Sequence, residues 1–273
     1  MKHKIKFQVP QLERAFDMGD PSGQDLVFLQ VVKEGLHHYE PPLPMLVVSY
    51  LSRYQGTFID VGANTGLYSL IAAAVSEDVN VVAFEPLPQI YVKLVENIRL
   101  NEAFARRTRT SPVALSRRTG TLDFYETIND MGYLSTSSTL EENHARAIGA
   151  KFVRQKVSAM TLDDWVAENP IKNLSMIKID AEGHEPAVLE GGIATISSHR
   201  PLITVELLAG SEFDFFREFL RRQNYLNFEL EVDCVRQEPV ASFSAKSWNH
   251  LLCPVEKVYQ FLAAARAIRL EII

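Results

Sequence analysis

Short runs of apolar residues alternate with longer segments in which apolar residues recur every three or four positions, from about residue 56 onward. The short runs have the length of buried strands, and the longer segments have the period of helices. This alternation predicts an α/β fold, in which a mostly parallel sheet carries helices on both faces. The expected strands are residues 57–61, 81–84, 111–115, 175–180, 201–206, 225–232 and 250–253.

Helix starts are marked by local signals between these strands. A helix is expected over about residues 65–75, a second one opens at Pro86 and Pro88, and another covers residues 212–223. Thr161 is followed three residues later by Asp164, which is typical of a capped helix start. Pro186 is expected to start a short helix that Gly191 and Gly192 end.

Two regions do not follow the alternation. Residues 1–52 are predicted to be helical, notably at 26–35 and 45–54, and to form an N-terminal helical cap or lid on a main domain at residues 53–273. Residues 127–156 have the least regular pattern. An extra strand is expected at residues 121–125 before this segment, and a short helix is expected within it at 141–148.

Composition narrows the class of protein. The 273 residues are 47% hydrophobic and 23% charged, which suits one large α/β domain. The net charge of -6 argues against nucleic acid as a partner. Two cysteines without metal-ligand spacing, no signal peptide and no apolar run of ~20 residues predict a cytoplasmic protein without stable membrane insertion. A homo-oligomer is compatible with these features.

A turn rich in small residues lies where the first strand meets its helix. Gly62 and Gly66 let the backbone approach a ligand closely, and the helix start offers free N–H groups to a carboxylate or phosphate. Glu85, at the tip of the second strand, is placed to accept hydrogen bonds from both hydroxyls of a ribose. The order strand, turn, helix, strand, acid predicts a nucleotide-type cofactor site. The alternative is a tight turn with a solvated Glu85.

The turn also discriminates between cofactors. A dinucleotide needs G-x-G-x-x-G so that a pyrophosphate can lie on the helix, and Asn64 stands where the second glycine belongs. S-adenosylmethionine (AdoMet) has no phosphate, and its carboxylate can use the same N–H groups. Asp60 can face its ammonium group directly or through water. These residues therefore favour AdoMet over NAD.

Five segments in this order resemble the FkbM-type AdoMet-dependent methyltransferases: residues 58–66, 84–86, 113–116, 161–165 and 177–185. The resemblance runs from about residue 55 to 255. It implies the class I methyltransferase (Rossmann-like) fold over residues 53–273 and an O-methyltransferase that acts on sugars, polyketides or related small molecules. Ala181 departs from the valine that the family often has, which changes packing and no chemistry.

The same resemblance assigns residues to the cofactor. It implies that Gly62, Asn64 and Gly66 line the methionine end of AdoMet and that Glu85 holds the ribose. Ser116, at the tip of the third strand, then falls near the adenine, and a simple turn serine is an equal alternative.

The segment after the fourth strand carries the candidate chemistry. If the strand conformation persists, Asp180, Glu182 and His184 point the same way, at the sheet edge where α/β proteins bind substrates. Methyl transfer to a hydroxyl requires loss of its proton, and His184 has a suitable intrinsic pKa range for a base. Asp180 or Glu182 could orient His184, act as the base or ligate a divalent metal. Glu182 and His184 could also simply hold the loop.

A metal is not expected, because no spacing among Asp163, Asp164, Asp180, Glu182 and His184 identifies one, and helix capping explains Asp163 and Asp164 equally well. The expected acceptor is a small molecule or saccharide. A methyltransferase acting on a nucleic acid or protein, a nicotinamide-dependent oxidoreductase and a non-catalytic binding module are the alternatives.

Overall fold

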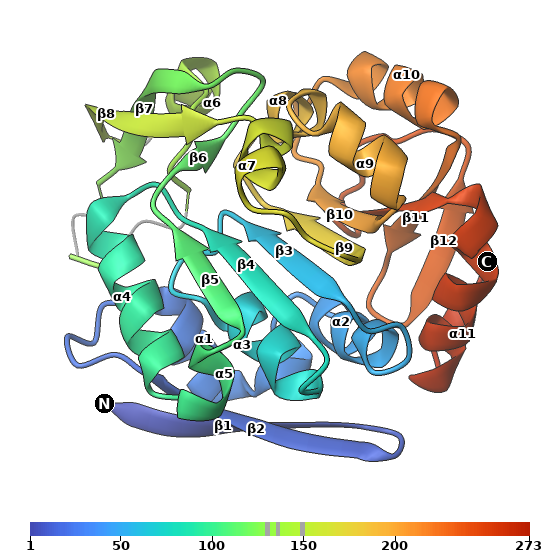
Figure 1. Ribbon diagram of the computed structural model, residues 1–273, viewed down its shortest axis with the longest axis horizontal. Coiled ribbons are helices and arrows are strands. Elements are labelled where there is room, and N and C mark those ends of the chain that lie inside the picture. Colours follow the sequence, from blue (N-terminus) through green and yellow to red (C-terminus); the bar gives the residue numbers. More distant parts are fainter. Residues whose placement is uncertain (129–131, 135–136, 148–150) are drawn as a thin grey trace.

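The structure is a computed structural model that describes residues 1–128, 132–134, 137–147 and 151–273. Within these residues, nine strands form a central sheet with helices on both faces (Figure 1). Its order is β14-β12-β11-β13-β10-β9-β3-β4-β5. Five neighbouring strands from β10 to β5 are parallel, and β13 runs antiparallel to β10. The strands are β3 (Thr57–Val61), β4 (Asn80–Phe84), β5 (Thr108–Ser111), β9 (Leu174–Ile179), β10 (Leu202–Glu206), β11 (Tyr225–Leu230), β12 (Cys234–Glu238), β13 (Asn249–Pro254) and β14 (Glu271–Ile272).

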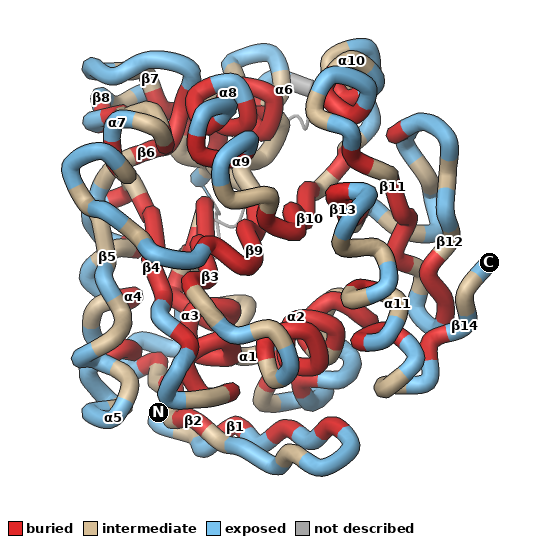
Figure 2. The backbone as a smooth tube through the Cα atoms, turned by 45° about the vertical axis from the view of Figure 1, so that its right-hand side comes forward, coloured by how far each residue is buried: buried red, intermediate tan, exposed pale blue. Residues whose placement is uncertain are grey.

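This order is that of a class I methyltransferase sheet, and the predicted α/β fold is confirmed. Because both faces are covered, every residue of β3 and β9 is buried (Figure 2). Alternate side chains enter different cores. Phe58 packs in one core with residues of α2 (Leu43–Leu51), α3 (Leu67–Val75) and α11 (Val258–Ala267). Ile59 packs in the other, formed with α7 (Leu162–Glu168), α8 (Glu185–Glu190), α9 (Ile193–His199) and α10 (Phe213–Gln223).

The third expected strand is displaced. The strand that pairs with β4 is Thr108–Ser111, and Ala114–Leu115 forms β6, which leaves the sheet and pairs with β8 (Phe152–Met160). Pro112 separates the two because it has no N–H group to donate to a strand ladder. The predicted single strand at residues 111–115 is therefore wrong.

The N-terminal prediction is wrong for its first part. Instead of helices, residues 2–19 form a hairpin of β1 (Lys2–Val9) and β2 (Leu12–Gly19). Ile5, Phe7 and Val9 are buried and alternate with exposed residues, the period of a half-buried strand. The hairpin packs on the helices of one sheet face, at the lower edge of Figure 1. The helices expected next are present as α1 (Leu26–Glu34) and α2, joined by η1 (Leu36–His38).

Residues 114–160 contain a second, smaller sheet in the order β6-β8-β7, with β7 at Gly120–Thr127. The extra strand expected at 121–125 is part of β7, and the short helix is α6 (Glu142–Ala147). Residue 148, the expected end of that helix, lies outside the described residues. Among the described residues, no helix combines the length and apolar character needed to cross a membrane. The remaining helices are α4 (Pro88–Arg99), α5 (Glu102–Ala105) and η2 (Val255–Lys257).

Candidate functional site

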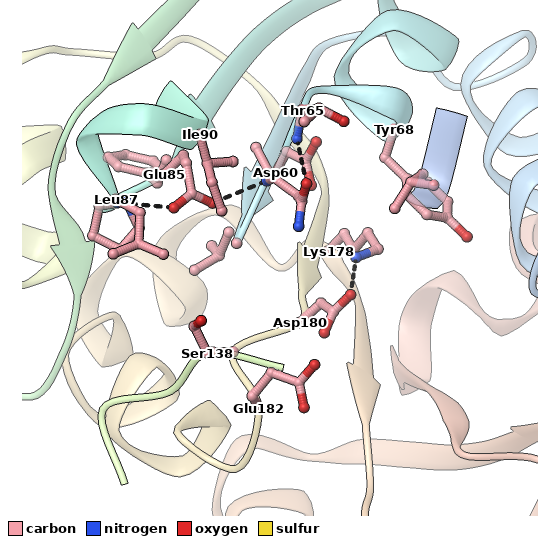
Figure 3. Close-up of a pocket in the computed structure, with 18 of the residues that line it drawn as sticks. Asp60, Thr65, Tyr68, Glu85, Leu87, Ile90, Ser138, Lys178, Asp180 and Glu182 are labelled. Atoms are coloured by element: carbon pink, nitrogen blue, oxygen red, sulfur yellow. Dashed lines mark hydrogen bonds and ion pairs between the residues drawn. The ribbon is translucent and has the colours of Figure 1, made fainter. Parts of the chain in front are cut away.

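A cavity of about 440 Å³ opens at the carboxyl ends of β3, β4, β9 and β10. Ligands of open α/β sheets bind at this edge, and the volume is within the ~300–1,000 Å³ of small-molecule pockets. Its lining comes from residues far apart in the chain (Figure 3). The polar residues that line it include Gln30, Tyr39, Glu40, Asp60, Asn64, Tyr68, Glu85, Ser137, Ser138, Lys178, Asp180, Glu182 and Glu206.

Glu85 follows β4 and is only 5% exposed. One carboxylate oxygen accepts a hydrogen bond from the backbone N–H of Asn64 (3.0 Å), and the other accepts one from that of Leu87 (2.9 Å) (Figure 3). Burial raises the pKa of Glu85 to about 7, against the lowering effect of these two N–H groups. Each oxygen keeps a second lone pair, so the fixed carboxylate can still accept hydrogen bonds from a ligand.

The glycines of the turn serve packing in addition to ligand approach. Gly62 has a φ of +73°, and a Cβ there would lie 1.9 Å from the backbone oxygen of Asp180. Gly66 has a φ of +99°, and a Cβ would lie 2.7 Å from Leu94. A side chain at residue 62 would therefore push apart the two strand ends that carry the site.

The backbone N–H groups of the turn already have acceptors. Those of Gly62 and Ala63 donate to the oxygen of Phe84, and that of Gly66 donates to Ala63. The N–H of Asn64 donates to Glu85, as described above, and that of the next residue donates to the Asn64 side chain. The expectation that these groups bind the carboxylate of a ligand therefore does not fit the turn. The cavity also reaches the first turn of α3, where Leu67 and Tyr68 line it.

Asp60 lies near the end of β3 with 1% of its surface exposed. The Ser69 hydroxyl donates to one oxygen at 2.6 Å, whereas the other, Oδ1, is buried without a hydrogen-bond partner among the described residues. Burial raises the pKa of Asp60, and the positive charge of Lys178 opposes this shift. Because a buried polar atom without a partner costs about 1–3 kcal/mol, the free oxygen indicates a site for a donor group of a ligand.

Lys178 places a buried cation beside the cavity. Its ammonium group lies 2.8 Å from Asp180 and 4.6 Å from the centre of the Tyr68 ring (Figure 3). Burial alone would lower the pKa of Lys178, but Asp180, Glu40 and Asp60 outweigh it and raise this pKa. The Tyr68 hydroxyl donates to Glu40 at 2.7 Å, which brings the segment after η1 to the site.

Three carboxylates meet at the opposite end of the cavity from Glu85. Asp180, Glu182 and Glu206 can place one oxygen each within 4.8 Å of one another, close enough to hold a metal ion. Burial raises the pKa of Glu206 to about 10, and the neighbouring Asp180 and Glu182 add to this shift. Asp163 and Asp164, the other acids considered as ligands, lie elsewhere: Asp163 accepts hydrogen bonds from backbone N–H groups at the start of α9.

His184 is turned away from the cavity, which its side chain does not line. Its Nδ1 lies 2.6 Å from the Glu141 carboxylate, and its Nε2 lies 3.0 Å from the Ser116 hydroxyl. The expected alternation of Asp180, Glu182 and His184 is wrong, because β9 ends at Ile179 and Glu182 has a φ of +52°. The left-handed backbone at Glu182 and Gly183 reverses the direction of the chain before His184.

Ser116 and Gly66 also do not line the cavity, whereas Asp60, Gly62, Asn64, Glu85, Asp180 and Glu182 do. Three functional candidates were not predicted. Glu206 is the last residue of the fifth expected strand, and its position at the same sheet edge as Asp180 was the available signal. Glu40 lies in the segment that was expected to form the cap or lid, but its sequence did not mark it as a site residue. Lys178 gave no signal, because a lysine in a strand has many possible uses.

The strand order and the carboxylate at the end of β4 are those of the class I methyltransferase fold. A family model described as "Methyltransferase FkbM domain" matches residues 60–226. The chain belongs to this family, and the oxidoreductase alternative is set aside.

Two curated relatives and one solved structure are similar to this chain. The 2-O-methyltransferase NoeI of Sinorhizobium fredii (strain NBRC 101917 / NGR234) is 28% identical over 58% of this chain and 66% of its own length. The methyltransferase sdnD of Sordaria araneosa is 27% identical over 49% of this chain and 59% of its own. The chain thus matches less than two thirds of the length of each. A crystal structure of the methyltransferase FkbM from Methylobacillus flagellatus KT is similar with a TM-score of 0.48, at 16% identity over 72% of this chain and 43% of that one.

Proposed function

We propose that the protein transfers the methyl group of AdoMet to a hydroxyl group of a small molecule or saccharide. One observation carries this proposal: a single cavity joins the buried acids Asp60 and Glu85 to the carboxylates of Asp180, Glu182 and Glu206. The first pair has the acceptors that a cofactor with a ribose and an ammonium group requires. The second group can bind a hydroxyl and take its proton.

The residues at the first end fit AdoMet. Glu85 would accept hydrogen bonds from the ribose hydroxyls, and the partnerless oxygen of Asp60 would accept one from the ammonium group. The carboxylate group of AdoMet would lie at the first turn of α3, because the N–H groups of residues 62–66 already have acceptors. Asn64 supports Glu85 through its N–H group. AdoMet supplies a methyl group made electrophilic by the attached sulfonium.

At the second end, we assign the base to Asp180. It lines the cavity, and its carboxylate lies 2.8 Å from the ammonium group of Lys178. Glu206, with its pKa raised to about 10, is neutral near pH 7 and can donate a hydrogen bond to the acceptor. A positioned base contributes about 10²–10⁴-fold, whereas alignment of two reactants reaches effective molarities of ~10⁵–10⁸ M. The walls that hold the acceptor therefore matter at least as much as the base.

Two features favour an uncharged hydroxylated acceptor. The acceptor end is rich in carboxylates, which would repel phosphate groups of a nucleic acid or a phosphorylated metabolite. The relative NoeI is named as a 2-O-methyltransferase, which supports oxygen as the methyl acceptor.

The proposal is tested by binding and by product analysis. S-adenosylhomocysteine binding is measured by calorimetry, with NAD as the comparison ligand. Labelled AdoMet is then incubated with methyl glycosides and polyketide-like alcohols, and the methylated atom is located by NMR. Binding of S-adenosylhomocysteine and an O-methylated product would support the proposal. Labelling of nitrogen or carbon alone would overturn it.

A further inference from the structure

Residues 137–147 contribute to the wall of the cavity and contact the loop that carries the candidate chemistry. Ser137, Ser138 and Leu140 line the cavity, and Figure 3 draws Ser138 and Glu182 at the end away from Glu85. The segment continues into α6, where Ala145 is fully buried. We call residues 137–147 the roof. Its residues come from the part of the chain that has the least regular sequence pattern.

Three side-chain contacts join the roof to the loop at residues 180–184. The Thr139 hydroxyl donates to the backbone oxygen of Glu182 at 2.7 Å. The His144 ring lies 3.6 Å from the carboxylate of Glu182, and this carboxylate raises the pKa of His144. The third contact, between Glu141 and His184, is the shortest at 2.6 Å. All three reach a loop whose residue 182 has left-handed backbone geometry.

The hydrogen bonds of His184 leave it no free nitrogen. An ionised carboxylate only accepts hydrogen bonds, so Nδ1 carries a proton toward Glu141. The other nitrogen, Nε2, bonds to the Ser116 hydroxyl at 3.0 Å, and the side chain is buried. His184 therefore connects three separate segments: the roof, its own loop and the residue after β6.

We propose that the chain of hydrogen bonds from Glu141 through His184 to Ser116 latches the roof over the acceptor, so that Glu141 and His184 are positioning residues for acceptor binding. This inference rests on the proposed function for the identity of the cavity end. Leu140 of the roof packs with Leu87 and Ile90 beside Glu85, whereas Thr139 and His144 hold the loop of Glu182 at the acceptor end. Opening the latch therefore weakens acceptor binding more than cofactor binding. His184 acts on the acceptor through the shape of the loop and does not exchange a proton with it.

Adjacent acids of the roof allow a matched test. Glu141 and Glu142 follow one another, but Glu142 bonds to the hydroxyl of Tyr125 and to Arg146, with no contact to His184. Glu141→Ala removes the latch, and Glu141→Gln keeps an oxygen that can accept from Nδ1. Glu142→Ala removes the neighbouring charge with its bonds to Tyr125 and Arg146 but leaves the contact between Glu141 and His184. The first measurement is hydrogen–deuterium exchange of residues 137–147 and 180–185 in the protein alone.

We expect Glu141→Ala to raise exchange at both segments by about tenfold, since a hydrogen bond to a charged group corresponds to roughly that factor or more. The KM for the methyl glycoside or alcohol found in the product screen should rise by about tenfold as well, with a smaller rise, of about threefold or less, in the Kd of S-adenosylhomocysteine. In Glu141→Gln, the exchange rate and the KM should both return most of the way to their values in the unchanged protein. In Glu142→Ala, neither should change. Rescue by the amide distinguishes a specific hydrogen bond from general loosening.

The latch is overturned if exchange is unchanged in Glu141→Ala, if Glu142→Ala matches it, or if S-adenosylhomocysteine binding weakens as much as acceptor binding. Failure of every acceptor in the screen would count against the proposed function. The exchange measurement would still decide the latch, because it needs no acceptor.

Discussion

The two ends of the cavity are built differently. At the cofactor end, Asp60 and Glu85 stand at the ends of adjacent parallel strands, are almost fully buried and are held by groups within 21 residues in sequence. At the acceptor end, the side chains of Asp180 and Glu182 are 32% and 18% exposed, and their partners include a roof some 40 residues away. Under the proposed function, a fixed cofactor site adjoins an acceptor site assembled from distant segments, which can vary without changing the cofactor.

The strongest test of this division is Asp180→Asn. The amide cannot take the proton of an acceptor hydroxyl, so we expect kcat to fall by about 10²–10⁴-fold. Binding of S-adenosylhomocysteine should change by less than about threefold, because its polar contacts lie at the other end. Steady-state kinetics and calorimetry measure the two quantities on the same preparation. Full turnover in this variant would remove Asp180 from the role of base.

The reciprocal test is Glu85→Ala. Loss of a charged hydrogen-bond acceptor costs roughly 1.5–3 kcal/mol, so we expect AdoMet affinity to fall by about 10–100-fold. At saturating AdoMet, kcat should stay close to that of the unchanged protein, in contrast to Asp180→Asn. Glu85 also supports the turn through Asn64, so circular dichroism and thermal unfolding serve as the control for folding. Unchanged AdoMet affinity would contradict the ribose role.

The same division explains what could be predicted from the sequence. The strand at residues 57–61, its helix and Glu85 follow one another in the chain, and local patterns were enough to predict them. The N-terminal hairpin was missed although Ile5, Phe7 and Val9 alternate with polar residues, because β1 and β2 form no part of the parallel sheet.

The acceptor end was predicted less well for a physical reason. The direction of His184 depends on positive φ angles at Glu182 and Gly183, and a period-two pattern assumes that the strand continues. Its partners Glu141 and Ser116 come from two other elements, so only the fold shows that both ring nitrogens are engaged. Glu206 carried a usable signal at its strand end, whereas Glu40 did not.

A pH titration sharpens the cofactor side of the comparison. The pKa of Glu85 is raised to about 7, so the carboxylate gains a proton as the pH falls through this value. Only the ionised Glu85 carboxylate accepts hydrogen bonds from both ribose hydroxyls in this proposal. With a pKa of about 7, its ionised fraction falls by about tenfold from pH 8 to pH 6, and the affinity for S-adenosylhomocysteine should fall by the same factor. Calorimetry at both pH values measures this change. Glu85→Gln should remove most of it, and an identical pH dependence in this variant would assign the effect to another group.

The smallest expected effect comes from a change outside both ends. The Thr161 hydroxyl accepts a hydrogen bond from the N–H of Asp164 at 2.9 Å and caps α7, and Thr161 does not line the cavity. Thr161→Ala should cost about 1 kcal/mol of unfolding free energy and lower the Tm by about 2–4 °C, whereas Thr161→Ser keeps the hydroxyl and the stability. Because the loss is global, AdoMet affinity and acceptor KM should stay equal to those of the unchanged protein. If Thr161→Ala instead weakened acceptor binding and left AdoMet binding unchanged, any loss of overall stability would be enough to disturb the acceptor end. The selective effects expected of Asp180→Asn and Glu141→Ala would then no longer identify residues of the site.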